Sequence, residues 1–336
     1  MRGTLSQESE VLKMEDDSFI MRNWVEVRIN AVDDFDQWID RVFLSEEQRA
    51  PYNRTEHGGY DSGQKWVFRG QADADWGIRS SLERLVFDCC FDAECRRAAE
   101  RQLIEEFQHR LRSILSGRKI PPFDLVALMQ HYGMPTRLVD FAYSAFVALY
   151  FAADEGAQYA DKDFAIWSVN LNDLHTDMQN VRIFDPYNAC KHEDGTHDNL
   201  AEELFDEESF GSPRSILYYR RPCSDNERSN AQSGAFMFQL SLGQGFMDDL
   251  KSCAGQGPDQ MELEELLKEN PFCTECTLYP SRLVTFRFDK SLRDRAIVKL
   301  RSMNMNRNTM FPDFDGDAET ISRTVNEILV DLNLKR

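Results

Sequence analysis

The sequence predicts an α+β fold in which helices are segregated from a mostly antiparallel or mixed sheet. Segments with strand-like and with helix-like hydrophobic spacing are both present, but they do not follow the regular strand–helix alternation of a parallel sheet. No internal repeat is found, which argues against solenoids and propellers. The chain of 336 residues is long enough for one large domain, and we expect a single domain over 23–336.

The first half of the chain begins with an acidic lead-in and continues with well-patterned elements. Residues 1–22 are polar and acidic, so we expect a flexible segment there. The elements expected next are a strand over 24–29, a helix over 33–43, a strand over 66–70, and helices over 93–115 and 124–132. Gly133 and Pro135 are expected to end the last helix, because glycine suits the left-handed cap and proline cannot continue a helix.

The second half mixes short apolar segments with acidic stretches. Ser144 is predicted to be the N-cap of an apolar helix that closes near Gly156. The other elements expected are strands over 136–140, 164–169, 216–219, 234–240 and 282–288, and helices over 292–303 and 318–332. The stretches near 185–210 and 242–275 are expected to be insertions in the same domain.

The composition and the charge distribution narrow the class of protein. With 42% hydrophobic and 29% charged residues, general disorder is excluded. The net charge of −19 argues against a general nucleic-acid coat protein, because phosphate binding relies on Lys and Arg. Residues 64–150 contain 12 basic and 11 acidic residues, so the rest of the chain carries about −20. This near-neutral centre suits an anionic ligand, although acidic flanks that only keep the protein soluble explain the pattern equally well.

The sequence also bears on location. No apolar run reaches the roughly 18 residues that a membrane-spanning helix needs, so we expect no membrane association. The N-terminus lacks the basic start and apolar stretch of a signal peptide. We therefore expect a cytoplasmic protein whose eight cysteines are reduced thiols.

Common catalytic and metal-binding motifs are missing from the sequence. No phosphate-binding P-loop, dinucleotide-binding G-x-G-x-x-G, G-x-S-x-G or H-E-x-x-H string is present. Cys273 and Cys276 form half of a zinc site, but a single C-x-x-C without a second pair is a weak signal. We therefore expect no metal.

Two blocks, residues 66–71 and 130–152, hold the residues that bear on chemistry. Arg69 follows an apolar strand and precedes Gly70, and a guanidinium is costly to bury without an anion or a carboxylate. Arg69 therefore either pairs with an internal carboxylate, for which Asp140 is the obvious candidate, or contacts a phosphate of a ligand.

These blocks resemble the FRG-domain family, which is named for the Phe-Arg-Gly that stands here at 68–70. The family pattern runs from an FRGQ strand through Trp, Ser-Leu and a helix to Gln-His-x-Gly-x-Pro-Thr-Arg-Leu-x-Asp-aromatic and Ser-x-x-Val-Ala-Leu-x-Phe-Ala. This chain matches it over 66–152, and the resemblance continues to 311–316. The residues that depart from the pattern are Phe141, Ala142 and Ala145.

The family is often found in bacterial defence or toxin loci, and its arrangement resembles that of ADP-ribosyltransferases. In that superfamily a first-strand Arg or His precedes a Ser/Thr element and a helix reading Ala-x-x-Phe-Ala, and a third-strand Glu completes the site. Arg69, residues 136–152 and the strand that begins near Gln232 occupy these places in order. The resemblance implies a split sheet around a cleft with flanking helices, as in ADP-ribosyltransferases.

The resemblance also implies roles for individual residues. Cleavage of the bond between nicotinamide and ribose develops an oxocarbenium-like cation, which needs a bent dinucleotide and a nearby negative charge. Arg69 would bind a phosphate or ribose, and His131 would contact the nicotinamide end. Gln232 would orient the 2′-hydroxyl, and Glu227 would supply the charge that an amide lacks. The implied cofactor-binding residues are Phe68, Arg69, Gly70, Gln71, Tyr132, Thr136, Arg137, Tyr143 and Ser144.

Structural interpretations of the same residues stay open. One alternative is that His131 and Tyr132 serve only to close a helix at Gly133. Thr136 and Arg137 could form a junction between loop and strand, with the arginine on the surface. The helix after Ser144 is more typical of core than of a cofactor site.

The function implied is an ADP-ribosyltransferase toxin or anti-phage effector that uses NAD as co-substrate and modifies a macromolecule. A basic run between Arg214 and Arg228, near the third strand, favours RNA or DNA over protein as the acceptor. An antitoxin protein would be a partner of such a toxin. Two alternatives stay open: a non-catalytic module that binds NAD or a nucleotide as a signal, and a metal-dependent nuclease of a defence system.

Overall fold

The computed structural model describes residues 24–48, 66–111, 120, 122–154, 159–170, 217–220, 234–239, 241–254, 257–268, 283–311 and 317–331. The strands are β1 (Trp24–Ile29), β2 (Trp66–Gln71), β3 (Val139–Ala142), β4 (Phe164–Asn170), β5 (Leu217–Arg220), β6 (Gly234–Gln239), β7 (Asp259–Met261) and β8 (Leu283–Phe288). The helices are α1 (Val32–Gln48), α2 (Ser81–Val86), α3 (Ala93–Leu111), α4 (Pro122–His131), α5 (Ala145–Asp154), α9 (Phe246–Ala254), α10 (Leu263–Lys268), the 3-10 helix η3 (Lys290–Leu292), α11 (Arg293–Ser302), α12 (Arg307–Met310) and α13 (Asp317–Asp331).

The described strands form one mixed sheet of eight strands in the order β5-β6-β3-β2-β4-β8-β1-β7. In the part of this order that runs β5-β6-β3-β2-β4-β8, every pair of neighbouring strands is antiparallel. The strand β1 lies parallel to both β8 and β7. The expected α+β class with a mixed sheet is therefore confirmed.

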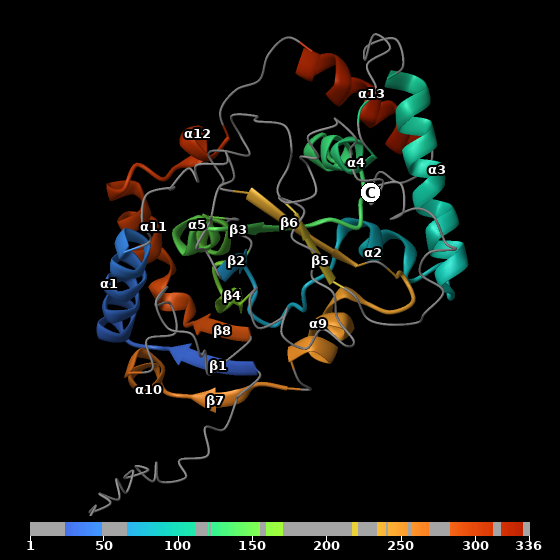
Figure 1. The fold of residues 1–336 in the computed structure, drawn as a ribbon. Helices are drawn as coiled ribbons and strands as arrows, with labels where there is room; N and C mark the ends of the chain where they lie inside the picture. The colour runs from blue at the N-terminus through green and yellow to red at the C-terminus, as the bar shows by residue number, and fades with distance from the viewer. Residues whose placement is uncertain are drawn as a thin grey trace, which may run out of the picture.

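The helices cover the sheet in separate groups. One core cluster lies between the sheet and α1, α5, α10 and α11, and a second lies between the opposite face and α9. A third cluster is formed mainly by α2, α3, α4 and α13. Figure 1 shows α3, α4 and α13 gathered on the side of the molecule away from α1 and α11. The segment between β2 and β3 thus builds a layer of helices beside the sheet.

The strand β2 and the helix α5 approach each other unusually closely. Phe68 of β2 is fully buried in the cluster that contains α5. A Cβ atom at Gly70 would lie only 1.9 Å from the carbonyl oxygen of Ala148 and 2.7 Å from the amide nitrogen of Ala152. Glycine on the strand and alanines one turn apart on the helix therefore allow backbone-to-backbone packing.

Several expected elements are confirmed with shifted ends. The strand expected over 136–140 is found as β3, three residues later. Ser144 Oγ accepts a hydrogen bond from the amide of Phe146, at 3.2 Å, which confirms the predicted N-cap of α5. The segments 1–22 and 185–210 lie outside the described residues.

The stretch near 242–275, expected to be an insertion, contributes to the sheet and to the core. It holds α9, β7 and α10, and β7 pairs with β1 at the edge of the sheet. Phe246 and Leu250 of α9 are fully buried in the second cluster. None of the described helices combines the length and the apolar composition needed to cross a membrane.

Candidate functional site

A hollow of about 170 Å³ opens where the end of β2 and the start of β3 meet α2 and the end of α4. Its lining residues are Arg69, Arg79, Ser81, Arg84, Gln130, Gly133, Met134, Leu138, Val139 and Asp140. Three arginines thus face one aspartate. This local positive charge contrasts with the net charge of −19 of the whole chain.

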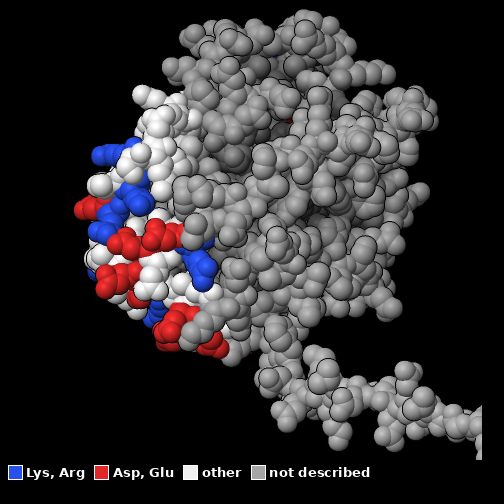
Figure 2. All heavy atoms as spheres, turned by 60° about the vertical axis from the view of Figure 1, so that its left-hand side comes forward, with Lys and Arg blue, Asp and Glu red and all other residues white. Residues whose placement is uncertain are grey.

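Charges on another face of the molecule are mixed. Figure 2 shows acidic and basic side chains interspersed on the described part of that surface. On the helices α11 and α1, for example, Nε of Arg295 lies 3.0 Å from Oδ1 of Asp36. The charges of such pairs cancel locally, and exposed pairs contribute little to stability.

Arg69 enters the hollow from β2. Its neighbour Phe68 is buried in the core, and its neighbour Gly70 packs against α5. Arg69 itself is half-buried. Its Nη1 donates a hydrogen bond to the main-chain carbonyl oxygen of Asp140, at 2.6 Å. This hydrogen bond orients the guanidinium toward β3. This contact differs from the carboxylate pair that was one of the two sequence-based interpretations.

The short helix α2 brings the other two arginines to the hollow. Ser80 caps α2, its Oγ accepting a hydrogen bond from the amide of Glu83, at 3.0 Å. Nη1 of Arg84 donates to the carbonyl oxygen of Arg79, at 3.0 Å. Nε of Arg79 lies 4.0 Å from Glu83, and both arginines are exposed. A ligand can therefore reach both guanidinium groups.

Hydrogen bonds between distant segments fix the wall of the hollow. Oγ of Ser81 accepts from the amide of Thr136, at 2.9 Å, and donates to the carbonyl oxygen of the same residue. Oγ1 of Thr136 donates to the side-chain oxygen of Gln130. Nε2 of Gln130 then donates to Oδ1 of Asp140, at 2.7 Å. The carboxylate of Asp140 is thereby held in one orientation.

The end of α4 forms another part of the rim. Gly133 has a φ of +86°, and its amide donates to the carbonyl oxygen of Gln130 while the amide of Met134 donates to that of Met129. This pair of bonds is a Schellman cap, which requires the left-handed conformation that glycine adopts readily. His131 and Tyr132 pack edge to face, 5.0 Å between ring centres, and neither lines the hollow. Their position agrees with the helix-closing interpretation.

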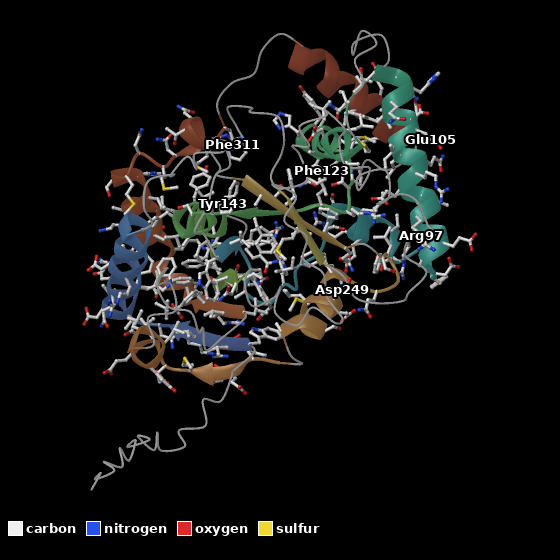
Figure 3. The ribbon with its side chains drawn as sticks, viewed as in Figure 1. Arg97, Glu105, Phe123, Tyr143, Asp249 and Phe311 are labelled. Atoms are coloured by element: carbon white, nitrogen blue, oxygen red, sulfur yellow. The ribbon has the colours of Figure 1, made fainter. Side chains whose placement is uncertain are left out.

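Other residues expected to bind the cofactor have contacts in the core. Phe68 and Gly70 pack beneath α5. Gln71 is 6% exposed, and its side-chain oxygen accepts a hydrogen bond from Nε1 of Trp167, at 2.6 Å. Tyr143 is buried in the second cluster (Figure 3), and Ser144 caps α5. In this structure these residues do not line the hollow.

Arg137 lies in the interior, neither on the surface nor in the hollow. It is 3% exposed and makes a two-pronged ion pair with the buried Glu100, with Nε 2.7 Å from Oε1. Its Nη1 also donates to the carbonyl oxygen of Gln239, at 3.0 Å. The side chain of Gln239 in turn donates to Asp249 on α9, which Figure 3 labels. Arg137 therefore connects α3, β6 and α9 rather than binding a cofactor.

Several sequence-based candidates lie outside the described residues. These are Gln232, Glu227, Cys273 and Cys276, together with most of the basic run between 214 and 228. The strand β6 begins two residues after Gln232 and pairs with β3. Among the described residues, no group of three or more His, Cys, Asp or Glu side chains is arranged to hold a metal ion.

Sequence reasoning missed Arg79, Arg84 and the role of Gln130. Exposed arginines carry no pattern that separates a binding residue from a solvated one, so only the position of α2 reveals them. The sequence signal that could have identified Gln130 is its place as the first residue of the Gln-His-x-Gly block. Glu83 was also missed: burial raises the pKa of its carboxyl, which accepts a hydrogen bond from the amide of Phe246, at 3.2 Å.

Residues 64–161 match the model of the FRG domain. This part of the chain is therefore similar to FRG domains. This matched segment includes β2, β3 and every residue that lines the hollow. No curated protein and no solved structure matches the chain.

Proposed function

We propose that this protein is an ADP-ribosyltransferase that binds NAD at the arginine-lined hollow and transfers ADP-ribose to a macromolecule. Nucleic acid is the preferred acceptor, and the role is that of a toxin or anti-phage effector. The observation that carries the proposal is the convergence of Arg69, Arg79 and Arg84 on one hollow inside the FRG segment.

Phosphate is the ligand chemistry that best suits this convergence. A guanidinium binds two phosphate oxygens at once, and each charge-assisted hydrogen bond contributes about 1.5–3 kcal/mol. An acidic chain that concentrates three arginines at one place attracts phosphate groups to that place, while its acidic flanks repel polyanions that have no specific site on the protein. The pyrophosphate of NAD has two adjacent anionic groups that fit such a site.

The size of the hollow limits what it holds. Pockets that enclose a whole small-molecule ligand usually measure about 300–1,000 Å³. The hollow measures about 170 Å³, so we assign it the pyrophosphate portion and not the entire dinucleotide.

The arrangement of strands supports the transferase proposal over simple phosphate binding. The three strands named by the resemblance are direct neighbours in the sheet, in the order β6-β3-β2. Phe68 of β2 pairs with Ala142 of β3, and Ala142 pairs with Gly234 at the start of β6. Strands that lie between Trp66 and Gln239 in the sequence are thus brought to one part of the fold.

Labelled NAD tests this proposal. The whole protein is incubated with NAD carrying a label in its adenosine part and with cell extract, and nucleic acid, protein and free nicotinamide are then separated. We expect label on nucleic acid and release of nicotinamide. Arg69→Ala should abolish both, whereas Arg301→Ala, an exposed arginine of α11 outside the hollow, should change neither. No label and no free nicotinamide with the wild-type protein would refute the transferase activity.

A module that binds NAD without cleaving it is the second candidate. The observation in its favour is that arginines outnumber carboxylates three to one among the lining residues. Such a module would bind NAD in calorimetry and release no nicotinamide. The same experiment therefore separates the two functions.

A further inference from the structure

Asp140 is the acidic residue among those that line the hollow, and its surroundings set it apart from an ordinary surface carboxylate. The residue is exposed, so its side chain is reachable from solvent. An exposed carboxylate usually moves among several rotamers. Here a chain of hydrogen bonds restrains it.

The restraint begins in the interior. Thr136 is 1% exposed, and its amide and carbonyl oxygen are both bound to Ser81. Its hydroxyl donates to Gln130, which turns the amide nitrogen of Gln130 toward Asp140. Because an amide has one donor end and one acceptor end, the bond to Thr136 decides which end meets the carboxylate. One oxygen of the Asp140 carboxylate is thereby held by the amide of Gln130.

Asp140 is also coupled to the arginine that we assign to phosphate binding. Nη1 of Arg69 binds the main-chain carbonyl oxygen of Asp140, at 2.6 Å. A phosphate on Arg69 would therefore lie in the same small hollow as the carboxylate, and a sugar attached to that phosphate would lie at the rim of the hollow. Positioned charge close to a reacting centre is the largest single contribution to catalysis in many enzymes.

We propose that Asp140 is the catalytic carboxylate of this site, an inference that rests on the proposed ADP-ribosyltransferase function. The bond between ribose C1′ and the pyridinium nitrogen breaks, and its electron pair goes to that nitrogen to give neutral nicotinamide. The positive charge that develops on the ribose is stabilised by the carboxylate. The acceptor then forms a bond to C1′, and the proton it loses passes to the carboxylate and on to solvent.

This assignment removes a difficulty in the sequence. Gln232 stands where the resemblance implies a glutamate, and a neutral amide adds no charge to oppose the cation. A carboxylate on β3, next to the arginine of β2, supplies that charge from the neighbouring strand. Gln130 is then a positioning residue, which acts through Asp140 and does not touch the substrate.

The test compares Asp140→Asn with Asp259→Asn in the whole protein. Asp259 is the matched control, because it is an exposed aspartate on a strand at the far edge of the same sheet. Nicotinamide release gives kcat and KM, and calorimetry gives the Kd for NAD. We expect kcat to fall at least 100-fold in Asp140→Asn with the Kd unchanged or lower, and no change in Asp259→Asn. Asp140→Glu should recover part of kcat.

Gln130→Ala tests the positioning role. We expect a smaller loss of kcat, about tenfold, with KM and Kd unchanged, since the carboxylate stays but loses its orientation. A Gln130→Ala protein in which KM and Kd rise while kcat holds would show a structural role instead.

The outcomes separate this inference from the function on which it rests. If wild-type protein releases nicotinamide and Asp140→Asn keeps kcat within threefold, Asp140 is not catalytic and the transferase function stands. If Asp140→Asn and Asp140→Glu both lose NAD binding and melt at clearly lower temperature, the carboxylate is structural and the inference fails. If wild-type protein releases no nicotinamide, the proposed function fails, and this is seen without any variant.

Discussion

Gly70→Ala is the most informative perturbation of the fold. Gly70 lies between the arginine of the hollow and the helix α5, and adding one methyl group there changes no charge and no hydrogen bond. A Cβ at this position would lie 1.9 Å from the carbonyl oxygen of Ala148 and 2.9 Å from its carbonyl carbon. Both are backbone atoms, so no side-chain rotation relieves the clash.

The size of the effect follows from these distances. Non-bonded heavy atoms reach their optimum at about 3.5–4.0 Å, so α5 must move away from β2 by roughly 1.5 Å. Overpacking of a core usually costs about 1–3 kcal/mol when side chains can adjust. Because this clash involves only backbone, we expect a loss of about 3 kcal/mol or more. In a protein of 336 residues that lowers Tm by about 4 °C or more.

Thermal and chemical denaturation of three glycine variants measure this loss of stability. Gly257→Ala is the control, because among the described residues beyond its chain neighbours no atom lies within 4 Å of the added methyl, and its Tm should stay within about 1 °C. Gly133→Ala also meets open space but has a φ of +86°, so it should cost about 1 kcal/mol through backbone strain. A Gly70→Ala protein that melts within about 2 °C of wild type would refute the close packing of α5 on β2.

Three further substitutions test the buried charges. Burial raises the pKa of Glu83, so this carboxyl stabilises the fold at low pH and loses that contribution as the pH rises through its folded pKa. The denaturation midpoint of Glu83→Gln relative to wild type should therefore increase between about pH 4 and pH 7, and a constant difference would contradict this. Arg293 donates to four main-chain carbonyl oxygens, two of them at the end of α5, so Arg293→Met should lose about 3 kcal/mol in urea unfolding; a loss below about 1 kcal/mol would contradict the role of these bonds. Glu100→Gln leaves Arg137 without its buried carboxylate, for which we expect about 3–5 kcal/mol of destabilisation by the same measurement, and a near-neutral result would show that the pair is dispensable.

Strands and helices with a buried face could be predicted from the sequence. Hydrophobic spacing located β2, β4 and β8 to within a residue or two, because the buried positions of each strand are occupied by apolar residues that lie close together in the sequence. The strand at β3 begins later than expected, because residue 136 is already bonded to Ser81, which stands 55 positions away. Local pattern contains no information about such a partner.

Short elements at the edge of the sheet could not be predicted. The strand β7 has three residues, and Asp259 and Gln260 are exposed. Neither its length nor its composition indicates a strand. It exists because Val25 to Val27 of β1 offer a parallel edge to pair with.

The candidate site was predictable only in part. The cost of burying a guanidinium identified Arg69, and it named Asp140 as its neighbour. The sequence could not show that Arg69 binds the main-chain carbonyl oxygen of Asp140. The carboxylate of Asp140 instead accepts a hydrogen bond from Gln130. Phe68 and Gly70 were expected to bind the cofactor, because they belong to the Phe-Arg-Gly motif. In the structure they pack the helix α5 against the strand β2.

Calorimetric titration of NAD into the wild-type protein and Arg69→Ala, at low and at high salt, tests the central claim most directly. Loss of one charge-assisted phosphate contact should weaken binding about 10- to 100-fold, and added salt should weaken wild-type binding as well. We predict saturable binding at one site that Arg69→Ala largely abolishes and Arg301→Ala leaves intact. Binding that is absent, or that is equal in all three proteins, would contradict the assignment of the hollow to a phosphate-bearing ligand.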